Sequence, residues 1–158
     1  MKTRRFERST LGAMLAGLGL TVLVTSTPYL DRSLLADHIR SGYPTYSDAR
    51  IDSAVGAYLI LLTVIGALGV LAWLGSAWAV KAGKRWARPA ATTLFVLGTG
   101  LGLTLLLTND ASGDTGLAPV LGWAGMAPSL AGLVAVALLW RGARDGRTMG
   151  HDNYARLG

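Results

Sequence analysis

Residues 54–80 read AVGAYLILLTVIGALGVLAWLGSAWAV, and the residues that follow, 81–89, read KAGKRWARP. The first stretch contains no Asp, Glu, Lys, Arg or His. A helix crosses the hydrocarbon core of a bilayer, about 30 Å thick, with about 20 predominantly apolar residues. Residues 54–80 therefore predict a membrane-spanning helix, and the basic residues of 81–89 predict the membrane boundary that follows it.

Other parts of the chain repeat this pattern. Three more stretches are long, apolar and free of charged residues and histidine: 9–26, 89–108 and 117–140. We therefore predict an all-α integral membrane protein, an up-down four-helix bundle within residues 9–140. Residues 1–8 form a basic N-terminal segment and residues 141–158 form a tail. Residues 27–53 form the longer of two loops at the opposite end.

The composition agrees with a membrane protein. Hydrophobic residues make up 51% of the 158 residues. Charged residues make up 15%, whereas soluble proteins carry roughly 25%. This balance argues against a soluble enzyme and against a disordered protein. Cysteine is absent, which excludes disulfides, thiol redox chemistry and cysteine-ligated metal sites.

The basic residues gather at one end of the predicted bundle. Residues 1–8, 81–88 and 141–158 hold four Lys or Arg residues each, and residues 27–53 hold the other three of the 15. Segments rich in Lys and Arg normally stay in the cytoplasm. We therefore expect a multi-pass protein of the plasma membrane with both termini cytoplasmic. This distribution accounts for the net charge of +6, so we expect no nucleic-acid partner.

The first span has an alternative interpretation. MKTRRFER followed by an apolar run also resembles a signal peptide. The residues after the run, TSTPYL, lack the A-x-A pattern of a cleavage site. We therefore expect residues 9–26 to be retained; cleavage would leave three spans.

The loop 27–53 contains a predicted amphipathic helix, over about residues 31–41, which Gly42 and Pro44 end. Its apolar residues fall roughly on one helical face: Leu30, Leu34, Leu35 and Ile39. Two interpretations stay open, a lid that shields the ends of the spans and a docking face for a lipid or protein partner.

Ser47 is the predicted N-cap of the next helix. That helix is longer than the membrane is thick, so it either projects outward or breaks.

Small residues within the spans predict close helix packing. The pairs with four-residue spacing are Gly98 with Gly102, Ala13 with Gly17, and Gly125 with Ser129. Such pairs let helix backbones approach closely, which matters because lipid supplies no hydrophobic drive between helices. Two interpretations stay open here as well, packing within one bundle and a face for a homo-oligomer or another membrane protein.

Basic residues beside the spans are candidates for a second role. Two interpretations stay open for the following residues, that they only fix orientation or that they also gather anionic lipid headgroups: Arg141, Arg144, Arg147, Lys84 and Arg85.

Groups that carry chemistry are absent from the predicted spans. Proton-coupled transporters usually carry an ionisable residue within the membrane, and none is present here. The two histidines, His38 and His151, lie in different segments, and no P-loop or dinucleotide fingerprint occurs. We therefore expect no catalytic, cofactor or metal site. The predicted function is that of a non-enzymatic accessory or envelope component acting through protein or lipid contacts. The alternative is a small permease or channel subunit for a neutral or lipidic solute.

Three stretches carry a resemblance to a known group of proteins. HIRSGYPTYSDARID (38–52), KAGKRWARP (81–89) and SGDTGL (112–117) resemble small four-span membrane proteins of actinobacteria. This resemblance implies four spans and supplies no active site. The layout of a longer first loop and a short second one is also similar to tetraspan proteins of the claudin type. The paired loop cysteines and the W-GLW motif of that family are missing here, so its function is not carried over.

Overall fold

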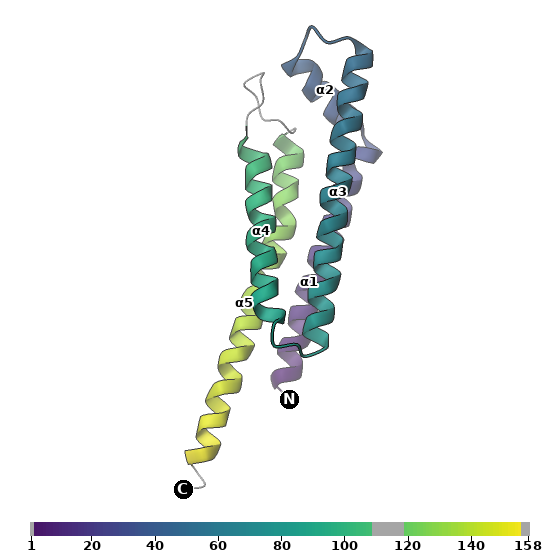
Figure 1. Cartoon of the computed structure of the whole chain (residues 1–158). Helices are drawn as coiled ribbons and strands as arrows, with labels where there is room; N and C mark the ends of the chain where they lie inside the picture. The colour runs from purple at the N-terminus through teal and green to yellow at the C-terminus, as the bar shows by residue number, and fades with distance from the viewer. Residues whose placement is uncertain (1, 109–118, 156–158) are drawn as a thin grey trace.

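The structure is a computed structural model that describes residues 2–108 and 119–155, with side chains at 7–108, 120–142 and 144. The elements in order are α1 (Lys2–Leu30), α2 (Ser33–Gly42), α3 (Asp48–Lys81), α4 (Ala87–Leu107) and α5 (Pro119–Ala155). The four long helices form an up-down bundle (Figure 1). The short α2 follows α1 and precedes α3 in the chain. The predicted all-α bundle is confirmed.

Four helices are long and apolar enough to cross a membrane: Glu7–Leu30, Asp48–Lys81, Ala87–Leu107 and Val120–Gly142. In the 18-residue apolar window of each, only 6% to 22% of the residues are buried. A soluble bundle would turn most of its large apolar side chains inward. Here Leu68 and Leu97 are 61% and 64% exposed. The chain is therefore a multi-pass membrane protein whose apolar spans contact the lipid bilayer.

The four spans pack unevenly around the bundle. α1 makes its most extensive contacts with α5 and also packs along α3, while α4 packs along α5. α3 and α4 follow each other in the chain but contact each other far less than these pairs do. Figure 1 accordingly shows α4 beside α5 and α3 beside α1. We call the weakly packed boundary between α3 and α4 the α3–α4 seam.

Several helices extend beyond the predicted spans. α3 is unbroken over 34 residues, about 50 Å at 1.5 Å per residue, and it projects beyond α4 and α5 (Figure 1). Ser47 is its N-cap residue, although the hydroxyl makes no capping hydrogen bond. α1 continues through the buried Pro28 to Leu30, past the predicted end at residue 26. Pro28 has no N–H to donate to the Val24 carbonyl, so α1 lacks one backbone hydrogen bond just before its end.

Two clusters of buried apolar side chains lie at the two ends of the bundle. We call the end with α2 the cap end and the end with the α3–α4 connector, residues 82–86, the basic end. The cap-end cluster joins α2, α3 and α5 through Leu35, Ile39, Ile51, Val55, Leu59 and Leu121. The basic-end cluster joins α1, α4 and α5 through Met14, Ala91 and Ala135, with Trp73 of α3 packed against it.

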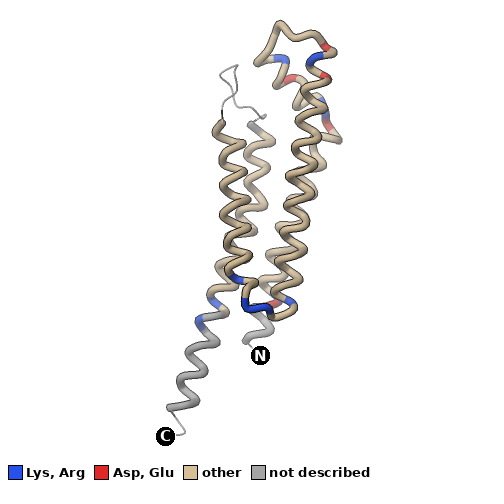
Figure 2. The backbone as a smooth tube through the Cα atoms, in the orientation of Figure 1, with Lys and Arg blue, Asp and Glu red and all other residues tan. Residues whose placement is uncertain are grey.

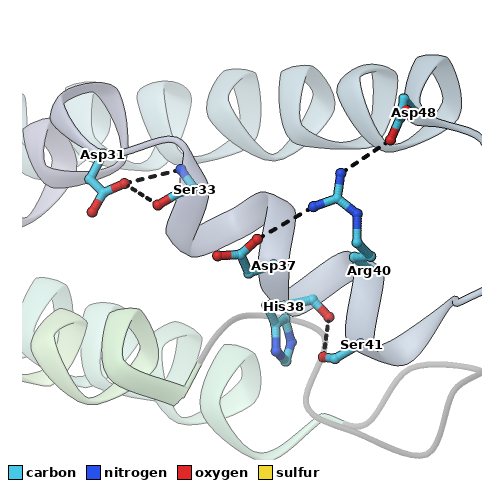
Figure 3. A network of polar contacts seen from close by, with 7 residues as sticks. All are labelled: Asp31, Ser33, Asp37, His38, Arg40, Ser41 and Asp48. Carbon is cyan, nitrogen blue, oxygen red and sulfur yellow. Dashed lines mark hydrogen bonds and ion pairs between the residues drawn. The ribbon is translucent and has the colours of Figure 1, made fainter.

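α2 is held mainly by its apolar face. Leu35 and Ile39 are 1% and 6% exposed. The polar contacts of α2 are at the surface (Figure 3). Arg40 contacts Asp37 at 3.4 Å and Asp48 at 3.2 Å, and all three side chains are more than half exposed. Exposed ion pairs contribute about 0–1 kcal/mol each, so burial fixes α2 over the cap end of α3.

The chain between α2 and α3 is ordered by aromatic contacts. The rings of Tyr43 and Tyr46 stack with their centroids 4.6 Å apart. The Arg50 guanidinium lies over the Tyr46 ring, 4.6 Å from its centroid. α2 and the start of α3 therefore form one compact cap beyond the ends of α4 and α5.

Candidate functional site: an apolar cavity at the α3–α4 seam

An apolar cavity of about 360 Å³ is lined by all four spans and extends from Leu121 of the cap-end cluster to Met14, Ala91 and Ala135 of the basic-end cluster. Its wall extends over Met14–Pro28 of α1, Leu62–Ser76 of α3, Ala91–Leu105 of α4 and Leu121–Val136 of α5. The fourteen-residue step from Ala91 to Leu105 corresponds to about 21 Å along the helix axis. The cavity is therefore long and narrow and runs parallel to the helices.

Missing side chains help to create this space. Gly98 of α4 and Gly125 of α5 line the cavity, and a Cβ added at either would have no other atom within 4 Å. These two glycines were expected at helix contacts, but each faces open space. Ser129, the other member of the α5 pair, also lines the cavity.

The cavity opens sideways through the α3–α4 seam. Leu68 of α3 and Leu97 and Leu101 of α4 line it, yet they are 61%, 64% and 44% exposed. These side chains lie at once on the cavity wall and on the outer surface of the bundle. Because that surface belongs to membrane-spanning helices, the opening faces the acyl chains of the bilayer.

The cavity wall is apolar apart from a few hydroxyls. Thr21 donates a hydrogen bond to the Gly17 carbonyl at 2.8 Å and accepts one from the Trp73 ring N–H at 3.0 Å. The Thr99 hydroxyl oxygen is buried and has no hydrogen-bond partner among the described residues. No ionisable side chain is among the described lining residues. This wall can hold an apolar molecule, and it offers no acid, base or strong nucleophile.

Trp73 closes the cavity toward α1. A Cβ added at Gly17 would overlap the Trp73 ring, and one added at Gly132 of α5 would lie 3.7 Å from it. The Trp73 ring therefore fills the hollow at Gly17, whereas the nearest neighbour of a Cβ at Gly132 is the Phe95 ring, at 3.0 Å. The spacing of Ala13 and Gly17 predicted that Gly17 packs against another helix. It did not identify Trp73 as its partner, because the sequence spacing within one helix does not show which residue faces it.

Other close contacts lie at glycines with different neighbours. A Cβ at Gly102 would lie 2.9 Å from the Met126 sulfur, and one at Gly122 would lie 2.8 Å from the Leu106 side chain. A Cβ at Gly66 of α3 would overlap Thr25 of α1. Ala13 packs against the basic-end cluster. Gly66 and Gly122 were not predicted, because neither was recognised as part of a pair with four-residue spacing.

We expect Gly66→Leu to destabilise the protein by about 1–3 kcal/mol, the usual cost of overpacking a tight contact. The overlap with Thr25 includes atoms close to the backbone of α1, so rotation of a side chain cannot relieve it. The measurement is thermal unfolding in detergent. Gly75→Leu is the matched control, because Gly75 is on the same helix and faces open space. Equal melting of the two variants would contradict the close contact between α1 and α3.

The predicted headgroup residues lie at the basic end (Figure 2). The connector leaves α3 through Gly83, whose φ of 64° is a conformation that favours glycine. It carries Lys84 and Arg85, while Arg141 and Arg144 follow on α5, all four exposed. The Arg147 side chain is outside the described part of the structure.

A hydrogen bond connects α5 to α4 near the basic end. The Trp140 ring N–H donates to the Thr92 hydroxyl at 3.2 Å, and that hydroxyl donates to the Arg88 carbonyl at 3.0 Å. Arg141 follows Trp140 directly in the chain, and Arg88 lies one helical turn before Thr92. The two arginines therefore belong to one basic region. We call Lys84, Arg85, Arg88, Arg141 and Arg144 the basic mouth.

The packing of α2 buries part of the predicted docking face and leaves the rest exposed. Leu35 and Ile39 point into the cap-end cluster, and Leu34 is partly buried. Leu30, at the end of α1, is 86% exposed. A docking role for this face stays a prediction, and Leu30 is its most exposed member.

Two other expectations can be placed only in part. The second loop, with its SGDTGL stretch, lies outside the described residues. Within the described residues, no group of three or more His, Asp or Glu that could hold a metal ion is found.

No family model matches the chain, and neither a curated protein nor a solved structure matches it. The function is therefore argued from the site alone.

Proposed function

We propose that this chain is a non-enzymatic component of the plasma membrane that binds a lipid or lipid-like molecule inside its bundle. The observation that carries the proposal is the apolar cavity of about 360 Å³ open to the bilayer at the α3–α4 seam. An apolar cavity of about 150 Å³ is enough to hold benzene. The larger cavity therefore has room for a considerably longer apolar group.

The position of the cavity favours binding from the membrane over passage of water or ions. Its described lining ends at Pro28 and Leu121 near the cap end and at Ser76 and Ala91 near the basic end. Buried clusters lie at both of these ends. An apolar wall also offers nothing to replace the hydration shell of an ion. A small permease subunit for a neutral or lipidic solute is the second candidate, because the sideways opening would admit such a solute from the bilayer.

The proposed orientation places the basic end and both termini in the cytoplasm. It rests on the concentration of Lys and Arg at that end. Reporter fusions after Arg8, at Gly83 and after Arg144 should read cytoplasmic, and fusions at Gly42 and Gly113 should read external. A cytoplasmic signal from Gly42 would overturn this orientation.

Lipid retention tests the proposed function directly. The protein is purified from native membranes in mild detergent, and bound lipid is measured by native mass spectrometry. We expect Gly98→Leu to lose the retained lipid, because the new side chain points into the open space of the cavity.

Gly100→Leu is the matched control for this experiment. Gly100 is on the same helix, also has open space around it, and is not part of the cavity wall. We expect it to retain lipid as the parent does. Equal retention by both variants, or no retention by the parent, would overturn the proposal.

A further inference from the structure

We infer that the cavity takes one acyl chain of an anionic phospholipid from the leaflet at the basic end, with the lipid phosphate at the basic mouth. The inference rests on the proposed lipid-binding function. It adds the class of lipid and the direction in which the lipid is bound.

The shape of the cavity fits an extended chain. Its length along α4 is about 21 Å at 1.5 Å per residue. The hydrocarbon core of a bilayer is about 30 Å thick, so the cavity is somewhat longer than the half that one leaflet contributes and shorter than the whole core. A volume of about 360 Å³ spread over this length leaves a narrow space. A single chain parallel to the helices fills such a space better than a compact molecule does.

The lower end of the cavity meets the basic mouth. Ala91 is the first residue of α4 in the cavity wall, and Arg88 precedes it by three residues, about 4.5 Å along the axis. Lys84 and Arg85 lie in the connector that closes the α3–α4 seam at this end. The headgroup end of an acyl chain that enters through the α3–α4 seam would therefore lie where these cations are exposed.

The charges at the two ends differ in their partners. At the cap end Arg40 is paired with Asp37 and Asp48, and Arg50 lies over the Tyr46 ring. At the basic end Glu7 of α1 is the single acidic residue among the described side chains. The described part of the structure shows no ion pair for Lys84, Arg85 or Arg88. Among the described side chains the cap end carries four carboxylates for its three arginines, so its net charge does not favour an anionic headgroup, whereas that of the basic mouth does.

The two α5 cations of the basic mouth lie beside a hydrogen bond that joins α5 to α4. The Trp140–Thr92 hydrogen bond, 3.2 Å long, holds α5 against the first turns of α4. Arg141 and Arg144 follow Trp140 on α5, and Arg88 precedes Thr92 by about one helical turn on α4. Cations from the connector, α4 and α5 therefore lie at one end of the bundle, where each can make a charge-assisted contact with a phosphate group. Such charge-assisted contacts are stronger than neutral hydrogen bonds.

Photolabelling in nanodiscs tests the inference. The full chain is reconstituted with photoreactive phosphatidylglycerol or phosphatidylcholine, each carrying the same diazirine-labelled acyl chain, and adducts are mapped by mass spectrometry. We expect adducts on the cavity wall of α3 and α4, with phosphatidylglycerol labelling severalfold more than phosphatidylcholine.

Two variants with reduced charge distinguish recognition of the lipid headgroup from binding of the acyl chain. Arg85→Gln with Arg88→Gln should remove most of the severalfold preference for phosphatidylglycerol, because each cation near an anionic surface contributes to it. Arg32→Gln with Arg50→Gln removes the same charge at the cap end and should leave the preference unchanged. The basic-end variant keeps Lys81 and Lys84 beside the membrane, so its orientation is preserved.

The outcomes distinguish the inference from the proposed function. If the parent is labelled equally by both lipids while Gly98→Leu abolishes labelling, the inference is wrong and lipid binding stands. If both charge variants lose the preference to the same extent, the basic mouth is not the headgroup site. If Gly98→Leu and Gly100→Leu are labelled equally, the proposed function itself is wrong.

Discussion

Gly17→Leu should destabilise the bundle more than any other substitution of a glycine in the cavity wall or its borders. The Trp73 ring occupies the space that a side chain at Gly17 would need, and a rigid ring cannot move aside as a methionine or leucine end can. Overpacking costs about 1–3 kcal/mol. Loss of the Trp73–Thr21 hydrogen bond adds about 1 kcal/mol. We expect a total of about 2–4 kcal/mol.

Thermal unfolding in detergent and tryptophan fluorescence together check this prediction. The melting temperature should fall, and the combined emission of the five tryptophans should shift because the Trp73 ring loses its packing against α1. Gly19→Leu is the matched control, since Gly19 is on the same helix and has open space around it. If Gly17→Leu melts like Gly19→Leu, Trp73 does not occupy the hollow at Gly17.

Leu35→Ala should release α2 from the cap end. The Leu35 side chain is 1% exposed within the cap-end cluster, and truncation of a buried leucine to alanine costs about 2–5 kcal/mol. The exposed ion pairs of Arg40 cannot compensate for this loss. We therefore expect faster hydrogen exchange and faster proteolysis within α2 and at the start of α3, with smaller changes in the four spans.

Leu30→Ala is the control for this second prediction. Leu30 belongs to the same predicted apolar face but is 86% exposed, so its truncation should leave exchange in α2 unchanged. If a membrane-protein partner docks on this face, Leu30→Ala should weaken capture of that partner without loosening α2. Equal exchange in Leu35→Ala and Leu30→Ala would contradict the packing of α2 against α3.

The spans and the basic end follow from the sequence because their signals are local. An uncharged apolar run has one stable environment in a membrane, so residues 54–80 predict a span without knowledge of their neighbours. The face of α2 is also local, since Leu35 and Ile39 are one helical turn apart. Helix ends are less certain, because tertiary contacts decide whether a residue such as Pro28 stays within the last turn of a helix.

The cavity could not be predicted because it depends on how far apart two helices lie. The spacing of Gly98 and Gly102 indicates that they share a face of α4, but it does not indicate what that face meets. In the structure Gly102 meets Met126, while Gly98 meets open space. The difference depends on which side chains the neighbouring helices place opposite each glycine, and Met126 belongs to α5. The same reasoning applies to Trp73, whose partners Gly17 and Gly132 lie on two other helices.

The central claim is that the space at the α3–α4 seam is filled from the bilayer and not by water. Because the natural chain has no cysteine, a single spin label can be placed at Gly98→Cys without other changes. Its collision rates with oxygen, which dissolves in the bilayer, and with a water-soluble nickel chelate are then compared in nanodiscs. Gly100→Cys, which lies outside the cavity wall, is the lipid-facing reference, and Lys84→Cys in the exposed connector is the water-facing reference. We predict that the label at Gly98→Cys collides with oxygen far more than with nickel, as at Gly100→Cys. Nickel collisions as frequent as those at Lys84→Cys would show a water-filled space and contradict the account.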